Sequence, residues 1–371
     1  MKFKKQEEQE IVNMFLRACK IDNPSGNEEK IAHWVAQELE SLDIEPIIDD
    51  AYNVFFSIPG KGEPIFLNAH LDSVQPCEDK VPHFDGKTFF SRGETILGAD
   101  NLEGVTIILS AINYLKTHGI AHRPLDIILT TGEEVGGDGI KQFDFSQVCA
   151  KAGVVLDSAS PVGSIVIKAP SKYNFQIIIE GVPGHGGHSK KAFSAIKVMA
   201  DLVNGLPIGQ VDDNTKLNIG RIEGGRAINT IPGLVKVDGA IHALGDGEIR
   251  GENKDCEKVV KIIEKEIARV EKKYSKSKVK FAFEIVRYGY EFSPADPFIG
   301  EISEAIKKAK ITPKKVHSFG TSDANTFNCS GYKGLLLGTG AKNLHTTEES
   351  VDLEDMLKLL EITINLCKIT K

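Results

Sequence analysis

Hydrophobic and polar positions follow two alternating patterns over the first 170 residues, which predicts an alternation of helices and strands. Apolar residues that recur every three or four positions indicate amphipathic helices. Short apolar runs rich in β-branched residues are typical of strands buried on both faces of a sheet. The elements expected in chain order are helix 5–20, helix 24–42, strand 53–58, strand 64–71, helix 102–119, strand 125–131 and strand 152–158. Ser25 or Asn27 is the expected cap of the second helix, and Gly119 closes the third. This alternation favours an α/β fold with a mostly parallel sheet flanked by helices.

The pattern changes near residue 170 and returns to its first style after about residue 290. The elements expected between these points are strand 172–181, helix 191–205, strand 216–222, strand 233–244, helix 251–274 and strand 280–286. Their β-α-β-β-α-β order is that of the split βαβ unit, which closes as a small two-layer domain. The elements expected afterwards are helix 297–310, strand 334–338 and a closing helix from 351. We therefore expect one domain formed by 1–170 and 290–371, with a second domain, 171–289, inserted in it.

Length, charge and cysteine content limit the number of domains, the binding partners and the cellular compartment that we expect. The length of 371 residues exceeds what one compact core usually holds, which agrees with two domains. The net charge of −7 argues against a nucleic acid or an anionic membrane as partner. The segment 1–10, "MKFKKQEEQE", runs straight into charged residues, so we expect neither a signal peptide nor a membrane span. The six cysteines contain no CxxC pair, which fits reduced thiols in a cytoplasmic protein.

Polar residues gather where the predicted strands end. They are His70, Asp72, Asp100, Glu133, Glu134, Asp157 and, before the last helix, His345. The carboxyl ends of strands form the ligand crevice of an open α/β sheet, so we expect these side chains to meet there. His70 and Asp72 are two residues apart, so both side chains point the same way.

Several acids without basic partners would repel one another and raise each other's pKa. A divalent cation resolves this, and imidazole with carboxylate ligands suits zinc, with cobalt or manganese as alternatives. The chain has no GxSxG serine motif, and the stretch "GVPGHGGHS" breaks the dinucleotide fingerprint at Ser189. A metal centre is therefore the strongest chemical hypothesis.

Seven stretches resemble motifs of the co-catalytic zinc metallopeptidases, a family that includes peptidase T, aminoacylases and glutamate carboxypeptidases. They are "AHLDSV", "KTFFSRGETILGADN", "TTGEEVGGDG", "VVLDSA", "GRIEGGRAINTIP", "GTSDAN" and "LHTTEE". They occur in the order of the family, span nearly the whole chain and are most similar to the peptidase T-like branch. The resemblance implies a catalytic metal-binding domain at 1–170 and 290–371, and an inserted α+β lid at 171–289.

The resemblance also implies a pair of metal ions and assigns their ligands. His70 and Asp157 would bind one zinc ion, Glu134 and His345 would bind the other, and Asp100 would bridge the two. Two metals about 3.5–4 Å apart lower the pKa of a bound water toward ~7 and polarise a scissile carbonyl.

Two further acids take catalytic roles by the same resemblance. Asp72 would orient the imidazole of His70, in line with the rule that a metal-bound histidine gives its other N–H to an acceptor. Glu133 would be the general base, which takes the proton of the water as hydroxide attacks and passes it to the leaving amine. Adjacent side chains diverge in direction, so Glu134 can bind metal while Glu133 stays unligated. The implied activity is hydrolysis of an amide bond in short peptides, as in an aminopeptidase or tripeptidase.

The inserted domain would carry further contacts to substrate. His185 stands where the family places a lid histidine that stabilises the oxyanion, and His188 in the same loop is a rival for that role. Asn229 matches a residue that contacts substrate. The lid forms the dimer contact in many relatives, so the resemblance implies a homodimer through the inserted domain.

The chain departs from the family pattern at four positions. They are Asn101 in place of Asp, Leu102 in place of Lys, Thr321 in place of Gly, and His242 in place of an Arg that often grips a substrate carboxylate. An imidazole does not replace the bidentate guanidinium fork, so a preference for free C-terminal carboxylates is open. Arg226 or Arg250 would have to compensate.

Two alternatives stay open at this point. The first is the same chemistry on another substrate, as in an N-acyl amino acid deacylase or a carboxypeptidase-like enzyme. The second is a metal-bearing binding protein without turnover. The presence of Glu133 and of every ligand position disfavours the second.

Overall fold

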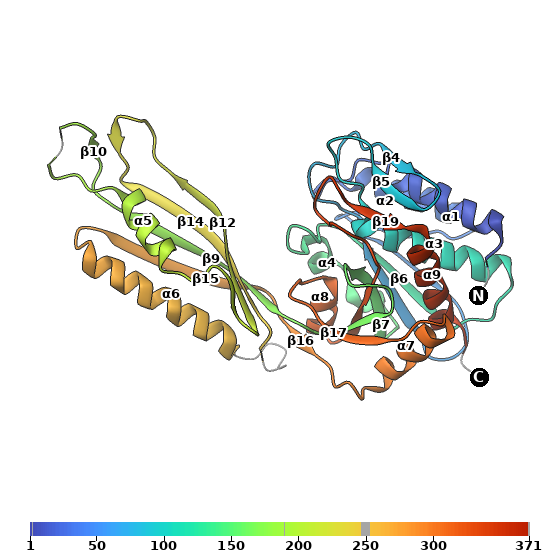
Figure 1. Cartoon of the computed structure of the whole chain (residues 1–371). Coiled ribbons are helices and arrows are strands. Elements are labelled where there is room, and N and C mark those ends of the chain that lie inside the picture. Colours follow the sequence, from blue (N-terminus) through green and yellow to red (C-terminus); the bar gives the residue numbers. More distant parts are fainter. Residues whose placement is uncertain (2, 189, 246–252, 370–371) are drawn as a thin grey trace. The chain divides into compact units, whose positions relative to one another are not determined.

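The computed structural model describes residues 1, 3–188, 190–245 and 253–369, and the contacts within the chain divide it into two compact units (Figure 1). Unit 1 consists of Met1–Ile167, Phe292–His317 and Ser322–Lys371. Unit 2 consists of Lys168–Glu291 and Ser318–Thr321.

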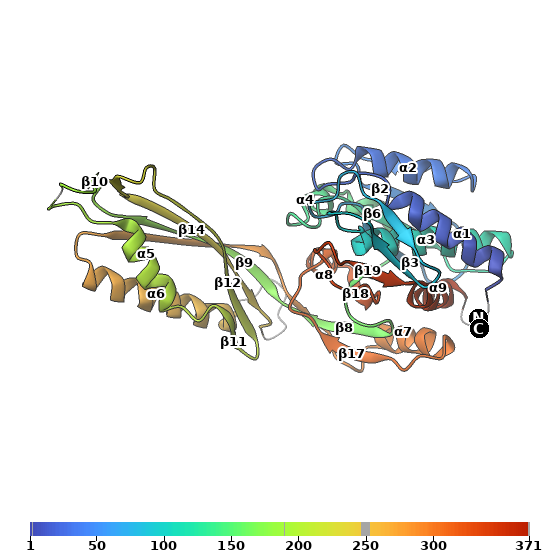
Figure 2. The same cartoon turned by 45° about the horizontal axis from the view of Figure 1, so that its top comes forward.

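The core of unit 1 is a mostly parallel sheet. Its strands in spatial order are β1 (Ile47–Ile48), β2 (Val54–Ile58), β6 (Leu125–Thr130), β3 (Ile65–His70), β7 (Ala152–Ser158), β18 (Lys333–Gly338) and β8 (Ser164–Ala169). The four central strands β6, β3, β7 and β18 are parallel to their neighbours within this group, whereas β2 and β8 add to it in antiparallel fashion. Two short strands pair with β8, namely β16 (Tyr290–Glu291) and β17 (Lys314–His317), and β17 is visible beside β8 in Figure 2. The parallel strands end at a common edge of the sheet, as the sequence pattern predicts.

Helices cover both faces of this sheet, because alternate residues of each central strand point to opposite sides. The larger core is formed with the apolar faces of α1 (Lys5–Ala18), α2 (Glu29–Glu40), α3 (Ala99–Thr117), α7 (Pro297–Lys308) and α9 (Leu353–Cys367). Ile65 and Leu67 belong to that core, while Phe66 between them faces the other side and stacks on Phe327 at 4.5 Å. Phe327 lies on α8 (Asp323–Cys329), and α8 lies with α4 (Asp138–Gln142) on this second face (Figure 1).

Local chemistry explains several helix ends. Pro297 occupies the first position of α7, and the side chain of Asp296 accepts a hydrogen bond from the Phe298 amide at 2.8 Å. Gly119 follows α3 with a φ of 57°, as its predicted role in closing this helix requires. The predicted cap of α2 is wrong. Its cap position is Glu28, and Ser25 instead donates to Asp72 Oδ2 at 2.7 Å.

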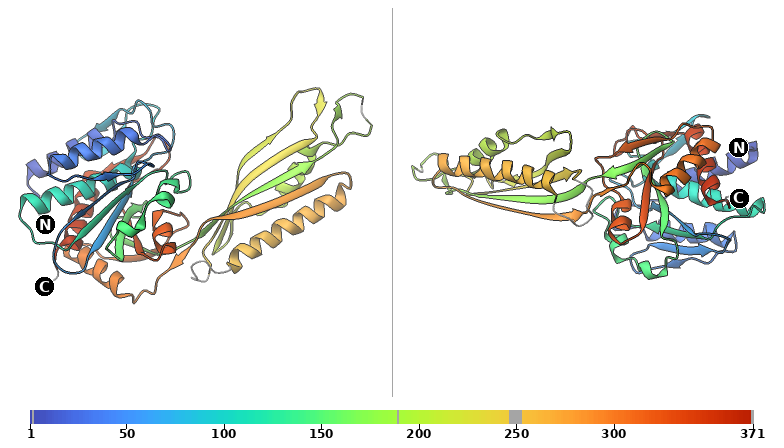
Figure 3. Two further views of the ribbon diagram at one scale, coloured as in Figure 1. Left: turned by 180° about the vertical axis from the view of Figure 1, so that it is seen from behind. Right: turned by 90° about the horizontal axis from the view of Figure 1, so that it is seen from below.

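Unit 2 is a two-layer domain with an antiparallel sheet. Its strands in spatial order are β11 (Gly209–Asp212), β12 (Thr215–Gly224), β14 (Leu234–Ala243), β9 (Ser171–Glu180) and β15 (Lys278–Arg287). The helices α5 (Ala195–Asn204) and α6 (Lys254–Lys273) lie on the same face of this sheet (Figure 3) and share its apolar core. A separate ribbon of β10 (Gly184–His185) and β13 (Thr230–Ile231) completes the unit.

The main elements lie where the hydrophobic pattern places them, and the short ones were not predicted. Missing from the prediction are a small sheet of β4 (Pro82–Phe84), β5 (Thr88–Ser91) and β19 (Ser350–Asp352), the short helix η1 (Phe145–Gln147), and β1, β8, β10, β11, β13, β16, β17, α4 and α8. Most of these elements have fewer than six residues, which is too short for a period of hydrophobicity to emerge. The start of the predicted helix 251–274 lies partly outside the described residues, and α6 begins at Lys254.

Gly153 on β7 tests the packing of the parallel strands. A Cβ atom at this position would lie 2.2 Å from Cγ of Phe66 and 2.3 Å from the backbone oxygen of Phe66. We expect Gly153→Ala to lower the free energy of unfolding by about 1–3 kcal/mol, because β3 has to move. The control is Gly300→Ala on α7, where nothing lies within 4 Å of an added Cβ. It should be neutral or stabilise by roughly 0.5–1 kcal/mol. Urea denaturation of the metal-free variants measures both, and equal stability of the two variants would contradict the prediction.

Candidate metal centre

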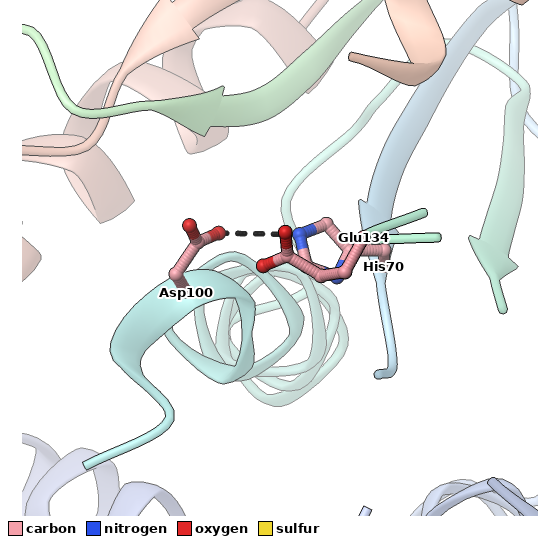
Figure 4. A group of neighbouring side chains, drawn as sticks. All are labelled: His70, Asp100 and Glu134. Atoms are coloured by element: carbon pink, nitrogen blue, oxygen red, sulfur yellow. Dashed lines mark hydrogen bonds and ion pairs between the residues drawn. The ribbon is translucent and has the colours of Figure 1, made fainter. Parts of the chain in front are cut away.

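Five predicted metal ligands converge within unit 1. His70 is the last residue of β3, Asp100 lies at the start of α3, Asp157 is near the end of β7, Glu134 follows β6, and His345 precedes β19. The donor atoms of His70, Asp100 and Glu134 lie within 4.8 Å of one another, and Figure 4 shows these three side chains facing a common point. The sheet edge predicted from strand ends is therefore the place where the side chains meet.

The five side chains form two sets of three that share Asp100. Nε2 of His70 lies 3.1 Å from Oδ1 of Asp100 and 3.3 Å from Oδ1 of Asp157. Nε2 of His345 lies 3.3 Å from Oδ2 of Asp100 and 3.1 Å from Oε1 of Glu134. Each imidazole thus faces two carboxylates, and the two oxygens of Asp100 are divided between the two imidazoles.

Protons balance the charges in this arrangement. Burial opposes protonation of His70, but Asp157, Asp100 and Asp72 outweigh it and hold the pKa of the imidazole well above its usual value. Hydrogen bonds to Asp100 and Glu134 raise the pKa of His345 to about 10.

Two of the carboxyl groups respond in opposite directions. Burial raises the pKa of Asp157 to about 7. Burial also acts to raise the pKa of Asp100, but the two imidazoles dominate and lower it. The proton of each imidazole lies between its Nε2 and two carboxylates, where a cation would bind, since divalent metals displace the protons of their ligands. The donor set of two imidazoles and three carboxylates, with one carboxylate shared, fits a pair of divalent cations.

Asp72 ties His70 to the two glutamates. It is fully buried, and its Oδ1 lies 3.3 Å from Nδ1 of His70, while Nδ1 also lies 2.9 Å from the backbone oxygen of Asp72. The same carboxylate accepts the amides of Glu133 at 3.0 Å and Glu134 at 3.1 Å. Asp72 therefore orients the imidazole and also fixes the turn that carries both glutamates.

Glu133 and Glu134 lie in this turn, which follows β6. Oε1 of Glu134 reaches His345, whereas Glu133 is 9% exposed at the start of the turn. Gly132 before them has a φ of 65°, which a side chain would disfavour. The glycine cluster that follows the pair in the sequence is part of the same turn.

Two buried glutamates that the prediction did not single out hold the neighbouring backbone. Oε1 of Glu28 accepts the amides of Gly26 at 2.9 Å and Gly132 at 3.0 Å. Glu349 accepts the amides of Gly98 at 2.7 Å and Asp100 at 2.9 Å. Glu349 lies within the stretch "LHTTEE", four residues after His345. This closeness to a predicted ligand was the signal in the sequence that could have pointed to it.

The contacts of Asn101 explain why this chain has an amide where the family usually has an aspartate. Its Nδ2 donates to Oδ1 of Asp157 at 3.2 Å, and its Oδ1 accepts the amide of Gly104 at 3.1 Å. An amide side chain supplies this donor, which an ionised carboxylate at the same position lacks. Leu102 is fully buried in the apolar core of unit 1, where a lysine would need a partner for its charge.

The predicted lid residues lie together within unit 2. His185 pairs with Thr230 between β10 and β13, and the amide of Gly186 donates to the backbone oxygen of Asn229 at 2.8 Å. The rings of His185 and His188 stack at 5.0 Å, so both rivals occupy the same loop.

His242 does not present a free imidazole at the position of the expected arginine. Its Nδ1 lies 3.0 Å from the backbone oxygen of Phe319, and burial, helped by Lys172 and Lys216, lowers its pKa. These two lysines are its direct cross-strand neighbours on β9 and β12. Arg226 is exposed, and Arg250 lies outside the described residues.

None of the helices in the described ranges combines the length and the apolar character needed to cross a membrane.

Residues 66–368 match the sequence profile of Peptidase family M20/M25/M40. The uncharacterized protein YqjE of Bacillus subtilis (strain 168) is 27% identical over 368 residues, which cover 96% of this chain and 97% of that protein. Two solved structures are similar over 97% of this chain and 98% of their own. They are aminopeptidase PepT from Bacillus cereus ATCC 10987, with 28% identity and a TM-score of 0.83, and a tripeptidase from Staphylococcus aureus subsp. aureus mu50, with 25% identity and a TM-score of 0.88.

These likenesses confirm the predicted fold class, a mostly parallel sheet flanked by helices together with a separate antiparallel domain. They also confirm the resemblance to the peptidase T-like branch of the metallopeptidases. Since the family profile spans most of the chain, the protein belongs to Peptidase family M20/M25/M40 and is a peptidase T-like hydrolase.

Proposed function

We propose that the protein is a two-metal aminopeptidase that cleaves an amide bond in short peptides, as a tripeptidase does. The observation that carries this proposal is the division of Asp100 between two imidazoles, each of which faces a second carboxylate. The relatives with solved structures support the peptide substrate, because one is an aminopeptidase and the other a tripeptidase.

The ligands of the two metal positions follow from the two sets of side chains. His70, Asp157 and Asp100 would hold one cation, and His345, Glu134 and Asp100 would hold the other. Zinc suits this donor set best, with cobalt or manganese as alternatives. When bound, a pair of cations supplies the Lewis acidity that acidifies a water molecule and polarises a carbonyl.

The residues of the chain handle the proton and the orientation. Glu133 accepts the proton of the attacking water on a carboxylate oxygen and delivers it to the nitrogen of the leaving amine. Glu134 cannot do both this and bind metal, which accounts for two adjacent glutamates. Asp72 keeps the imidazole of His70 in one orientation and holds Glu133 in place through its backbone amide.

The inserted domain would complete the site. His185, with His188 as the alternative, would stabilise the oxyanion, and Asn229 would contact the substrate. We further propose that unit 2 forms the contact of a homodimer and acts as a lid, and that the protein works in the cytoplasm.

An N-acyl amino acid deacylase or a carboxypeptidase-like enzyme is the second candidate. His242 bears on it, because its imidazole is engaged by the backbone of Phe319 and so offers no fork for a carboxylate. This observation favours recognition of a free amino terminus over recognition of a free carboxyl terminus.

A panel of substrates tests the reaction class. Tripeptides with a free amino terminus should be cleaved, and their N-acetylated forms and N-acetyl amino acids should not. A chelator should abolish the release of amino acids, measured by chromatography, and added zinc should restore it. Equal rates on free and blocked amino termini would exclude the aminopeptidase, and hydrolysis that persists in the metal-free protein would exclude a metal enzyme.

Glu133→Gln tests the general base. The variant should retain two metal ions per chain yet lose roughly a hundredfold or more in kcat, because the amide cannot accept a proton. Metal content and steady-state kinetics on the same preparation measure both effects. Glu45→Gln, on an exposed side chain, is the matched control and should be unaffected. A near-native rate in Glu133→Gln would refute its role.

His345→Ala tests the division of the ligands. The variant should keep one metal ion per chain after dialysis, because the set of His70, Asp157 and Asp100 stays intact. His33→Ala removes an exposed imidazole on α2 and should keep two ions. Metal analysis by mass spectrometry measures the stoichiometry. Two retained ions in His345→Ala would show that this residue is no ligand.

A further inference from the structure

The side chain of Glu349 connects the segment that carries His345 with the start of α3. Its side chain is 1% exposed, and its two oxygens take separate partners. Oε2 accepts the amide of Gly98 at 2.7 Å, and Oε1 accepts the amide of Asp100 at 2.9 Å. One carboxylate thus accepts two amides of the turn from which Asp100, the proposed shared ligand, projects.

The helix does not hold this turn by itself. The first amides of an α-helix have no acceptor within the helix. Asp100 has a φ of −85° and a ψ of 99°, which is outside the helical region, and Gly98 has a φ of 83°. The position of the Asp100 backbone therefore depends on acceptors from elsewhere in the chain, and Glu349 supplies them.

The position of Asp100 is critical because its two oxygens serve different imidazoles. Oδ1 lies 3.1 Å from His70 and Oδ2 lies 3.3 Å from His345. A rotation or shift of this residue that improves one contact lengthens the other. Glu349 also follows His345 by four residues, so it links the segment of one imidazole to the carboxylate that both imidazoles share.

Packing alone does not account for a carboxylate at this position. Burying a charged group is costly, and an apolar side chain of similar volume would avoid the cost unless the oxygens are needed as acceptors. The two amides give each oxygen a strong, charge-assisted hydrogen bond.

We propose that Glu349 is a positioning residue that fixes Asp100 between the two metal positions, and that it is needed for tight binding at both. This inference rests on the proposed two-metal function. Glu349 touches neither substrate nor metal and acts through the backbone of Asp100. A partner of this kind typically contributes 10–100-fold in metal affinity.

Glu349→Gln is the direct test, with Glu348→Gln as the matched control. The glutamine would turn its NH₂ group toward one of the two amides, where two donors oppose each other. Glu348 is the exposed neighbour, and its variant makes the same chemical change outside the turn. Glu349→Asp keeps two acceptor oxygens on a shorter side chain and should fall between the other two variants.

The measurements are zinc affinity, by competition with a chromophoric chelator, and the visible absorption spectrum of the cobalt-loaded protein. We expect Glu349→Gln to bind metal about 10–100-fold more weakly at both positions, with an altered cobalt spectrum. We expect Glu348→Gln to match the unmodified protein in both. Native affinity and a native spectrum in Glu349→Gln would overturn the inference.

Two further measurements, of stability and of peptide hydrolysis, distinguish the role of Glu349 from a general effect on folding and from the proposed function. Urea denaturation of the metal-free proteins detects a general loss of stability. If Glu349→Gln does not fold, the metal affinity of Glu349→Asp decides. Weaker metal binding than in the unmodified protein supports the positioning role, and native metal binding overturns it. An unmodified protein that binds two ions but hydrolyses no peptide would overturn the proposed function and leave the role of Glu349 standing. Full hydrolysis by the unmodified protein, together with native metal affinity in Glu349→Gln, would support the proposed function and overturn the role of Glu349.

Discussion

The repulsion among carboxylates brought to one buried place is the constraint on which the rest of the site depends. Asp100, Asp157 and Glu134 come from three separate segments and face only two imidazoles. Without a cation, protons have to balance these charges, and the raised pKa of His70 and His345 records that balance. A pair of divalent cations would release those protons and satisfy every carboxylate at once. In the proposed site the same cations would also offset the charge of one further acid, Glu133, which would then be available for proton transfer.

A second layer of buried carboxylates holds this arrangement through the backbone. Asp72 accepts the amides of both glutamates, Glu28 accepts the amide of Gly132 just before them, and Glu349 accepts the amide of Asp100. Loops at the ends of parallel strands have no ladder of hydrogen bonds of their own, so their amides need such acceptors. The backbone around the proposed ligands is therefore fixed by other buried acids, Asp72, Glu28 and Glu349.

The sequence predicts the sheet, and the meeting of the polar side chains at its edge, better than the loops. Long apolar runs such as 125–131 carry a clear strand signal, and the polar residues that follow them mark the functional edge of the sheet. The sequence does not predict the geometry of the turn that carries Glu133 and Glu134, because this turn depends on Asp72, 61 residues earlier in the chain. The roles of Glu28 and Glu349 depend likewise on contacts 104 and 249 residues away. No local pattern reports such contacts, whereas the alternation of apolar residues reports strand burial directly.

The proposed function requires that Asp100 is shared by two metal ions. The most direct measurement is a crystal structure of the zinc-loaded protein with anomalous scattering recorded at the zinc edge. We expect two anomalous peaks about 3.5–4 Å apart. One oxygen of Asp100 should lie at each peak, with His70 and Asp157 at one and His345 and Glu134 at the other. A single peak, or two peaks of which neither contacts Asp100, would contradict it.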